Sequence, residues 1–270
     1  MLADYHMHTT FSDGYNSHLE MVVGAKEKGM TEIGFSDHFS FDEPEWSGKA
    51  SEISQILEKV KQTRQTSKLS IKWGMEVDYL PDYHSQVVKI LEPYLSELDY
   101  ILGAIHYIGN WQCDDEKNYL DNGHYYYERD KIALLDPDKL FQTYHQLLQD
   151  AARTGLFDIM AHPDLIKKYA PKPKGDLTDV FNQTAKVFKE TGVVVEINSS
   201  GLEAPCQEIY PSKGFLIALF KAGVPITFGS DAHSPDRIGR YFDQALALAK
   251  AVGYSEYIQF TKRQRQVVKL

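Results

Sequence analysis

Cysteine is scarce in this chain of 270 residues, which contains only Cys113 and Cys206. The two residues form no Cys-x-x-Cys pair, and a single pair of cysteines builds no disulfide framework. A structural zinc site made of thiolates is therefore excluded. We expect both side chains to be ordinary reduced thiols.

Long apolar runs and an excess of positive charge are also lacking. No stretch approaches the roughly 20 consecutive apolar residues of a membrane helix, and residues 1–30 contain no basic segment followed by an apolar run. The 29 Lys and Arg against 38 Asp and Glu give a net charge of −9, whereas nucleic-acid binding needs clustered Lys and Arg. We therefore expect a cytoplasmic protein that has neither a membrane nor a nucleic acid as a partner.

The apolar runs that are present are short and alternate with longer amphipathic segments, which is typical of βα units around a parallel sheet. Ser17 and Glu20 fit a capping box, and Asp136 with Pro137 fits an N-cap and first helical residue. We expect one domain over residues 1–270, with an insert at about 107–130 that is either a lid or substrate loop or a plain surface loop. The predicted strands are 2–5, 32–36, 70–75, 100–104, 157–160, 193–197 and 225–229, and the predicted helices are 17–28, 51–66, 82–91, 137–154, 178–191, 212–222 and 241–252.

Ligand-type side chains follow every predicted strand. In a barrel of parallel strands these ends meet at one rim, where active sites lie. The residues concerned are His6, His8, Asp37, His38, Glu76, His106, His162, Glu196, Asn198, Asp231 and His233. A mixture of His, Asp and Glu without Cys suits zinc, iron or manganese, and the set is too large for one ion. The other four histidines, which are expected not to be ligands, are His18, His84, His124 and His145.

The order of the short motifs adds a family resemblance. The chain reads H-x-H, S-D-H, M-E, I-H, A-H-P and S-D-A-H, and this series resembles the polymerase and histidinol phosphatase (PHP) superfamily, in its histidinol-phosphate phosphatase branch. The resemblance covers essentially the full length and implies a distorted (β/α)7, TIM-like barrel with three divalent metal ions.

The resemblance also implies a ligand set. One ion is expected at His6, His8, Glu76 and Asp231, a second at Glu76, His106 and His162, and a third at Asp13, His38 and His233. Asp37 and Glu196 are expected to orient the imidazoles of ligating histidines.

The expected activity is the hydrolysis of a small phosphate monoester. A hydroxide bridging two metals would attack the phosphorus directly, with Glu76, Asp231 and His233 as the catalytic residues. The substrate implied by the resemblance is L-histidinol phosphate, cleaved to L-histidinol and phosphate in histidine biosynthesis. The alternatives are a PHP phosphoesterase for another phosphorylated metabolite or nucleotide, an amidohydrolase, and a non-catalytic metal-binding module.

Cations near the same rim are candidates for binding the substrate. They are Lys167, Lys168, Arg237, Arg240 and, in the insert, Arg129. In histidinol-phosphate phosphatases a segment N-x-x-G-L-R typically brings an Arg to the phosphate, whereas this chain has Glu203 at that Arg position. Three interpretations are open: Glu203 contacts the amino group of the substrate, another residue such as Arg129 supplies the cation instead, or the preferred substrate is not histidinol phosphate.

Overall fold

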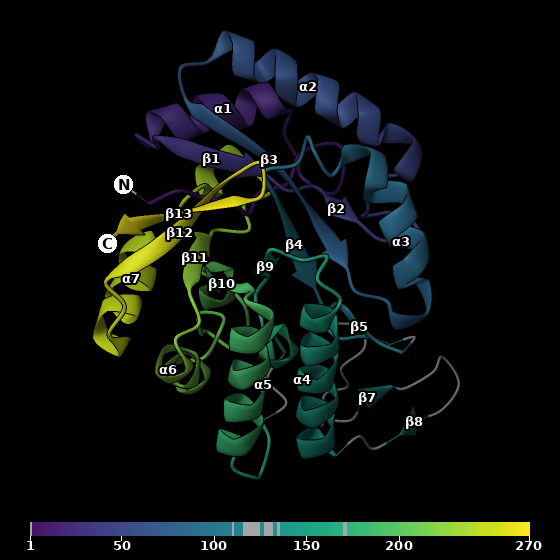
Figure 1. The fold of residues 1–270 in the computed structure, drawn as a ribbon, viewed down its shortest axis with the longest axis vertical. Helices are drawn as coiled ribbons and strands as arrows, with labels where there is room; N and C mark the ends of the chain where they lie inside the picture. Colours follow the sequence, from purple (N-terminus) through teal and green to yellow (C-terminus); the bar gives the residue numbers. More distant parts are fainter. Residues whose placement is uncertain (1, 110, 116–124, 127–131, 134–135, 170–171) are drawn as a thin grey trace.

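A curled parallel sheet forms the centre of the fold in the computed structural model, which describes residues 2–109, 111–115, 125–126, 132–133, 136–169 and 172–270. Figure 1 shows the helices arranged around the outside of the strands. The strand order is β1-β3-β4-β9-β10-β11, with β2 beside β3, and all these pairs are parallel. The bounds are β1 Glu32–Phe35, β2 His38–Phe39, β3 Ser70–Asp78, β4 Tyr100–Ala104, β9 Ile159–Met160, β10 Val194–Asn198 and β11 Ile226–Gly229.

The predicted strand at 2–5 is wrong in detail, because this segment makes single bridges and no ladder. Asp4 pairs with Ile33 of β1, and Met7 pairs with Ala232 after β11. Backbone hydrogen bonds run to both sides, from Gly34 N to Asp4 O at 2.7 Å and from His8 N to Ala232 O at 2.9 Å. The extended N-terminal segment thus closes the gap between the two edge strands of the sheet.

The helices agree with the sequence prediction to within a few residues. Ser17 forms the predicted capping box with Glu20, and the side chain of Asp136 accepts from the backbone N–H of Asp138 at the N-cap of its helix. The α-helices are α1 His18–Glu27, α2 Ile53–Thr66, α3 His84–Leu91, α4 Pro137–Arg153, α5 Thr178–Thr191, α6 Lys213–Ala222 and α7 Phe242–Val252. Short 3-10 turns lie at Ala50–Glu52, Pro81–Tyr83, Glu92–Tyr94, Leu165–Lys167, Ser200–Leu202 and Pro235–Arg237. No helix in these described ranges is long and apolar enough to cross a membrane.

A C-terminal hairpin, which was not predicted, closes the end of the barrel opposite the strand C-termini. Its strands are β12 Glu256–Thr261 and β13 Gln264–Lys269. Phe260 is fully buried, and its backbone N–H donates to the Tyr5 hydroxyl at 3.1 Å. The turn is held by Arg263 Nε, which donates to Asp158 Oδ2 at 2.8 Å. The segment is mostly polar in sequence, so its hydrophobic pattern did not predict that it would cover the end of the barrel.

The predicted insert at 107–130 is only partly described. It begins with a two-stranded hairpin of β5 Tyr107–Ile108 and β6 Trp111–Gln112. Further along, β7 Tyr125–Tyr126 pairs with β8 Ile132–Ala133. Residues 116–124 and 127–131, with Arg129 and His124, lie outside the described residues, so the role of the insert as a lid stays a prediction.

The packing of α4 generates a prediction about stability against pH. His145 is fully buried between Phe181 and Phe215, and its Nδ1 lies 3.1 Å from Thr184 Oγ1. Burial lowers the pKa of His145 to about 3. In the unfolded chain His145 takes up a proton near pH 6.5, whereas in the folded chain it stays neutral. The stability of the folded state therefore falls as the pH drops below that value.

Replacing His145 with Leu should reduce the loss of folding stability at acidic pH. Relative to wild type, the variant should recover about 2 kcal/mol of the stability lost between about pH 7 and pH 5. Urea unfolding of both proteins, in the presence of a chelator, measures the difference. His84→Gln removes a more exposed histidine of α3 and should keep most of the wild-type slope. Parallel curves for wild type and His145→Leu would contradict the assignment.

Candidate metal centre

Glu76 lies at the centre of a cluster of histidines at the C-terminal ends of the strands. Its side chain is fully buried at the end of β3. Oε2 lies 2.9 Å from His6 Nε2 and 3.0 Å from His38 Nδ1. Oε1 lies 2.8 Å from His162 Nε2 and 3.6 Å from His106 Nε2. One carboxylate therefore faces histidines delivered by four different segments of the barrel.

All nine candidate ligands fall into four overlapping groups, and in each group the ligand atoms lie within 4.8 Å of one another. Four residues, His6, His8, His38 and Glu76, each belong to two of the groups. The groups are His6, His8 and Asp231; His6, Glu76 and His162; His38, Glu76 and His106; and His8, Asp13, His38 and His233. The structure thus brings the nine predicted ligands together, but the groups differ from the expected sets: His162 shares a group with His6, His106 shares one with His38, and His8 also joins the Asp13 group.

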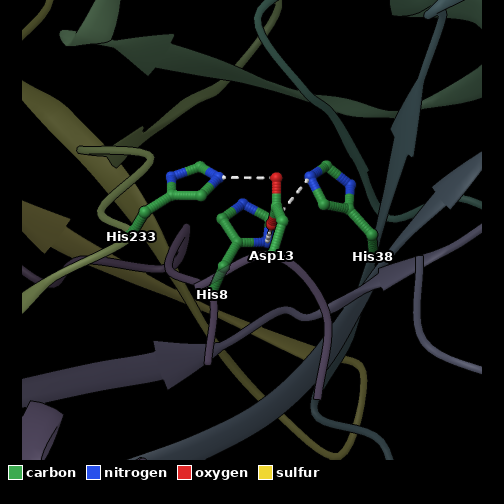
Figure 2. Close-up of side chains that lie close together, drawn as sticks. All are labelled: His8, Asp13, His38 and His233. Carbon is green, nitrogen blue, oxygen red and sulfur yellow. Dashed lines mark hydrogen bonds and ion pairs between the residues drawn. The ribbon is translucent and has the colours of Figure 1, made fainter. Parts of the chain in front are cut away.

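Figure 2 shows this last group, with the Asp13 carboxylate between the rings of His38 and His233 and the ring of His8 below. Asp13 Oδ2 lies 3.2 Å from His233 Nε2, and Oδ1 lies 3.7 Å from His38 Nε2. His8 Nδ1 is 4.0 Å from Asp13 Oδ1. Three imidazoles therefore converge on one carboxylate, which is a donor set suited to a divalent ion.

The loop that carries Asp13 is fixed by Asp37, contrary to expectation. The Asp37 carboxylate accepts from the backbone N–H of Thr9 at 2.6 Å and from the Ser12 hydroxyl at 2.9 Å. Its contact with an imidazole is the 3.8 Å approach to His18, which is not a candidate ligand. The prediction that Asp37 orients a ligating histidine is thus wrong among the described contacts, because its oxygens are used by the 9–12 turn.

Two other carboxylates and one backbone carbonyl contact the imidazoles of candidate ligands. Glu196 Oε1 lies 2.7 Å from His6 Nδ1, as expected. Asp78 Oδ1 lies 2.5 Å from His106 Nδ1, and the carbonyl of Asp231 lies 3.0 Å from His233 Nδ1. Such contacts fix the tautomer and leave Nε2 for a metal. Asp78 was missed, although it stands two residues after Glu76 on the same face of β3, and that spacing would have revealed it.

Two candidate ligands lie in a strained backbone conformation. His162 has φ of 25° and Asp231 has φ of 55°, in the left-handed region that side chains other than Gly rarely adopt. The backbone N–H of His162 donates to Glu196 Oε2 at 2.7 Å, which supports its position. Strain of this kind is common at functional sites.

The electrostatics of the cluster also fit metal ions. Burial opposes ionisation of Glu76 and Asp231, but the surrounding histidines, with His6 foremost, hold the pKa of each carboxyl well below its usual range. Burial and its histidine neighbours lower the pKa of His8 to about 4, so His8 is neutral at pH 7. Within the described residues, Nδ1 of His8 and Oδ1 of Asp13 are buried without a hydrogen-bond partner. Orphaned buried groups of this kind call for a ligand, and the cluster is therefore suited to divalent metal ions.

The centre opens on a cavity of about 350 Å³. Its lining includes Asp13, Asp231 and His233 of the cluster, together with Lys168, Glu203 and Arg240. Two predicted substrate contacts are placed elsewhere. Lys167 is buried and donates to the carbonyl of Ile209 at 2.8 Å, and Arg237 is outside the lining and pairs with Glu203.

The family described as "PHP domain" matches residues 4–200. The chain belongs to the PHP family. This PHP protein is 29% identical to a probable histidinol-phosphatase of Deinococcus radiodurans, with 98% of each chain covered. It is 23% identical to the histidinol-phosphatase of Bacillus subtilis, over 90% of this chain and 97% of the relative.

Solved structures confirm the predicted distorted TIM-like barrel. A histidinol phosphate phosphatase from Lactococcus lactis, complexed with zinc, L-histidinol and phosphate, matches with a TM-score of 0.79 at 22% identity, over 98% of each chain. A putative histidinol phosphatase from Listeria monocytogenes matches with a TM-score of 0.75 at 20% identity, over 90% of this chain and 99% of that one. At these identities the likeness concerns the fold.

The close approach of Gly229 to the cluster yields a prediction about metal binding. A Cβ at Gly229, at the end of β11, would lie 1.8 Å from Glu196 Oε1 and 2.6 Å from His6 Cβ. Gly229→Ala should therefore push Glu196 away from His6 and lower zinc affinity by about 10- to 100-fold. Titration of metal-free protein with zinc measures this.

The matched control is Gly214→Ala in α6, where the nearest atom to a new Cβ is 3.5 Å away on Phe181. Alanine favours a helix, so this variant should keep wild-type zinc binding and gain up to about 1 kcal/mol of stability. Unchanged zinc affinity in folded Gly229→Ala would argue against the Glu196–His6 contact as a support of the centre.

Proposed function

We propose that this chain is a metal-dependent phosphatase that hydrolyses a small phosphate monoester, with L-histidinol phosphate as its substrate. The observation that carries the proposal is the buried Glu76 carboxylate shared by histidines from several strands, beside a cavity with Lys168 and Arg240 on its wall. The full-length relatives named histidinol-phosphatase support the choice of substrate.

The nine ligands are proposed to hold three divalent ions of zinc, iron or manganese. Glu76 is shared between two of the sites, and His8 stands between the His6–Asp231 pair and the Asp13 group. When bound, such ions lower the pKa of water to near neutrality and offset the charge of phosphoryl oxygens. The chain itself contributes the spacing of the ligands, which the buried strand ends fix before any substrate binds.

Side chains that line the cavity are expected to bind the phosphate and to assist the departure of the alcohol. Lys168 lines it and carries positive charge toward the phosphate, and its Nζ is held by Asp114 Oδ2 at 3.3 Å. Asp231 and His233 line the same space and would hold a metal ion there, which would offset the negative charge that develops on the leaving oxygen. His233 is oriented for this by the Asp231 carbonyl at its Nδ1.

A substrate panel tests the proposal. Metal-replete protein should release phosphate from L-histidinol phosphate with a higher kcat/KM than from sugar phosphates, other amino-alcohol phosphates or nucleotides. A higher kcat/KM for another ester would keep the phosphatase and replace the substrate. Faster hydrolysis of amides than of any phosphate ester would overturn the reaction class.

A variant of Glu76 without the negative charge should lose both its bound metal and its phosphatase activity. Glu76→Gln keeps the size of the side chain but weakens the shared ligand, and kcat should fall by roughly 10³-fold or more. Metal analysis and phosphate release are measured on the same sample. Glu190→Gln, at an exposed Lys186–Glu190 pair of α5, is the control and should leave both unchanged. Near-normal activity in Glu76→Gln would refute the shared-ligand role.

A further inference from the structure

Two cationic side chains line the cavity within the described part of the chain, and they are held very differently. Lys168 forms an ion pair with Asp114, its ammonium lies over the Tyr169 ring, and its side chain is 30% exposed. Arg240 has a side chain that is 13% exposed and anchored at several atoms. A planar guanidinium that is held at several atoms favours one orientation of a bound anion, whereas an ammonium group acts as a point charge.

Arg240 is held by backbone and side-chain acceptors on both neighbouring loops. Its Nε donates to the carbonyl of Ser230 at 3.0 Å, and Nη2 donates to the carbonyl of Asp231 at 3.3 Å. Nη1 donates to Glu203 Oε2 at 2.8 Å. The Ser199 hydroxyl donates to the Arg240 carbonyl at 2.5 Å. These contacts use three of the five N–H donors of a guanidinium and leave two for a ligand.

Glu203 is engaged by cations of the chain itself. The same oxygen, Oε2, accepts from Arg240 and from Arg237. Two guanidinium groups thus share one carboxylate, and of the two arginines Arg240 lines the cavity whereas Arg237 lies outside its lining. The pair of arginines therefore favours an anionic group of the substrate here, and it argues against the expectation that Glu203 binds a positively charged one.

We propose that Arg240 binds the phosphoryl oxygens of the substrate and that Glu203 is its positioning residue. Arg240 lies in the segment after β11 that also carries Asp231, and it lines the cavity onto which the metal centre opens. A planar guanidinium matches two phosphate oxygens at once. This inference rests on the proposed phosphatase function.

The test uses the metal-loaded enzyme with inorganic phosphate as the probe. Arg240→Gln should weaken phosphate binding, measured calorimetrically and as competitive inhibition, by about 10- to 100-fold, the range for hydrogen bonds to charged groups. KM should rise by a similar factor. Bound metal should stay at the wild-type level, which separates loss of a phosphate contact from loss of the centre. Arg240→Lys keeps the positive charge but not the planar pair of N–H donors, so it should bind phosphate more tightly than Arg240→Gln but less tightly than wild type. It also replaces Arg240→Gln in the test if that variant misfolds.

Glu203 is tested through its coupling to Arg240. Glu203→Gln alone should weaken phosphate binding by several-fold, and the double variant Glu203→Gln, Arg240→Gln should bind no more weakly than Arg240→Gln. Additive losses would show that Glu203 acts independently and would overturn its positioning role. Arg237→Gln, which touches Glu203 from outside the cavity lining, should have a smaller effect than Arg240→Gln. Equal losses of phosphate affinity in Arg237→Gln and Arg240→Gln would show that only the overall positive charge matters, and would contradict the proposal.

Failure of the inference and failure of the proposed function give different results. If wild type hydrolyses phosphate monoesters while Arg240→Gln binds phosphate as wild type does, Arg240 has no such role and the phosphatase stands. If wild type hydrolyses none of them, the proposed function fails, and the inference, which rests on it, falls with it. Arg153→Gln, at an exposed Arg153–Asp150 pair of α4, is the control that should match wild type throughout.

Discussion

The buried carboxylate of Glu76 is the constraint on which the rest of the structure depends. A buried charge is costly unless it is paired, and here the partners are the imidazoles of His6, His38 and His162 at 2.8 to 3.0 Å. Those histidines come from segments that are distant in sequence, so they meet only when the barrel closes. The fold and the centre are therefore linked, since neither the strand order nor the N-terminal closure can change without separating the ligands.

Much of this arrangement could be predicted because two simple rules apply. Helix starts such as Ser17 and Asp136 follow local hydrogen-bond chemistry, and the structure shows both caps. Ligand-type residues after successive strands meet at one rim because parallel strands end there, and the structure brings the nine candidates together. Asp13 obeys no strand-end rule, and only the family resemblance pointed to it.

The parts that escaped prediction depend on contacts between distant segments. Asp37 holds the 9–12 turn, and Lys167 turns inward to the Ile209 carbonyl; neither orientation is visible in a linear sequence. The C-terminal hairpin has a polar sequence, yet it plugs the barrel with Phe260. Glu203 looked like a reversal of charge at the phosphate, and its pairing with Arg237 and Arg240 gives it a different physical meaning.

We propose that these nine side chains form one centre for three divalent ions, with Glu76 shared between two of them. Anomalous diffraction from crystals grown with excess zinc or manganese tests it most directly. The account predicts three peaks in the cluster, two of them within bonding distance of the Glu76 carboxylate and one between Asp13, His38 and His233. A single peak, or peaks that do not contact Glu76, would contradict it.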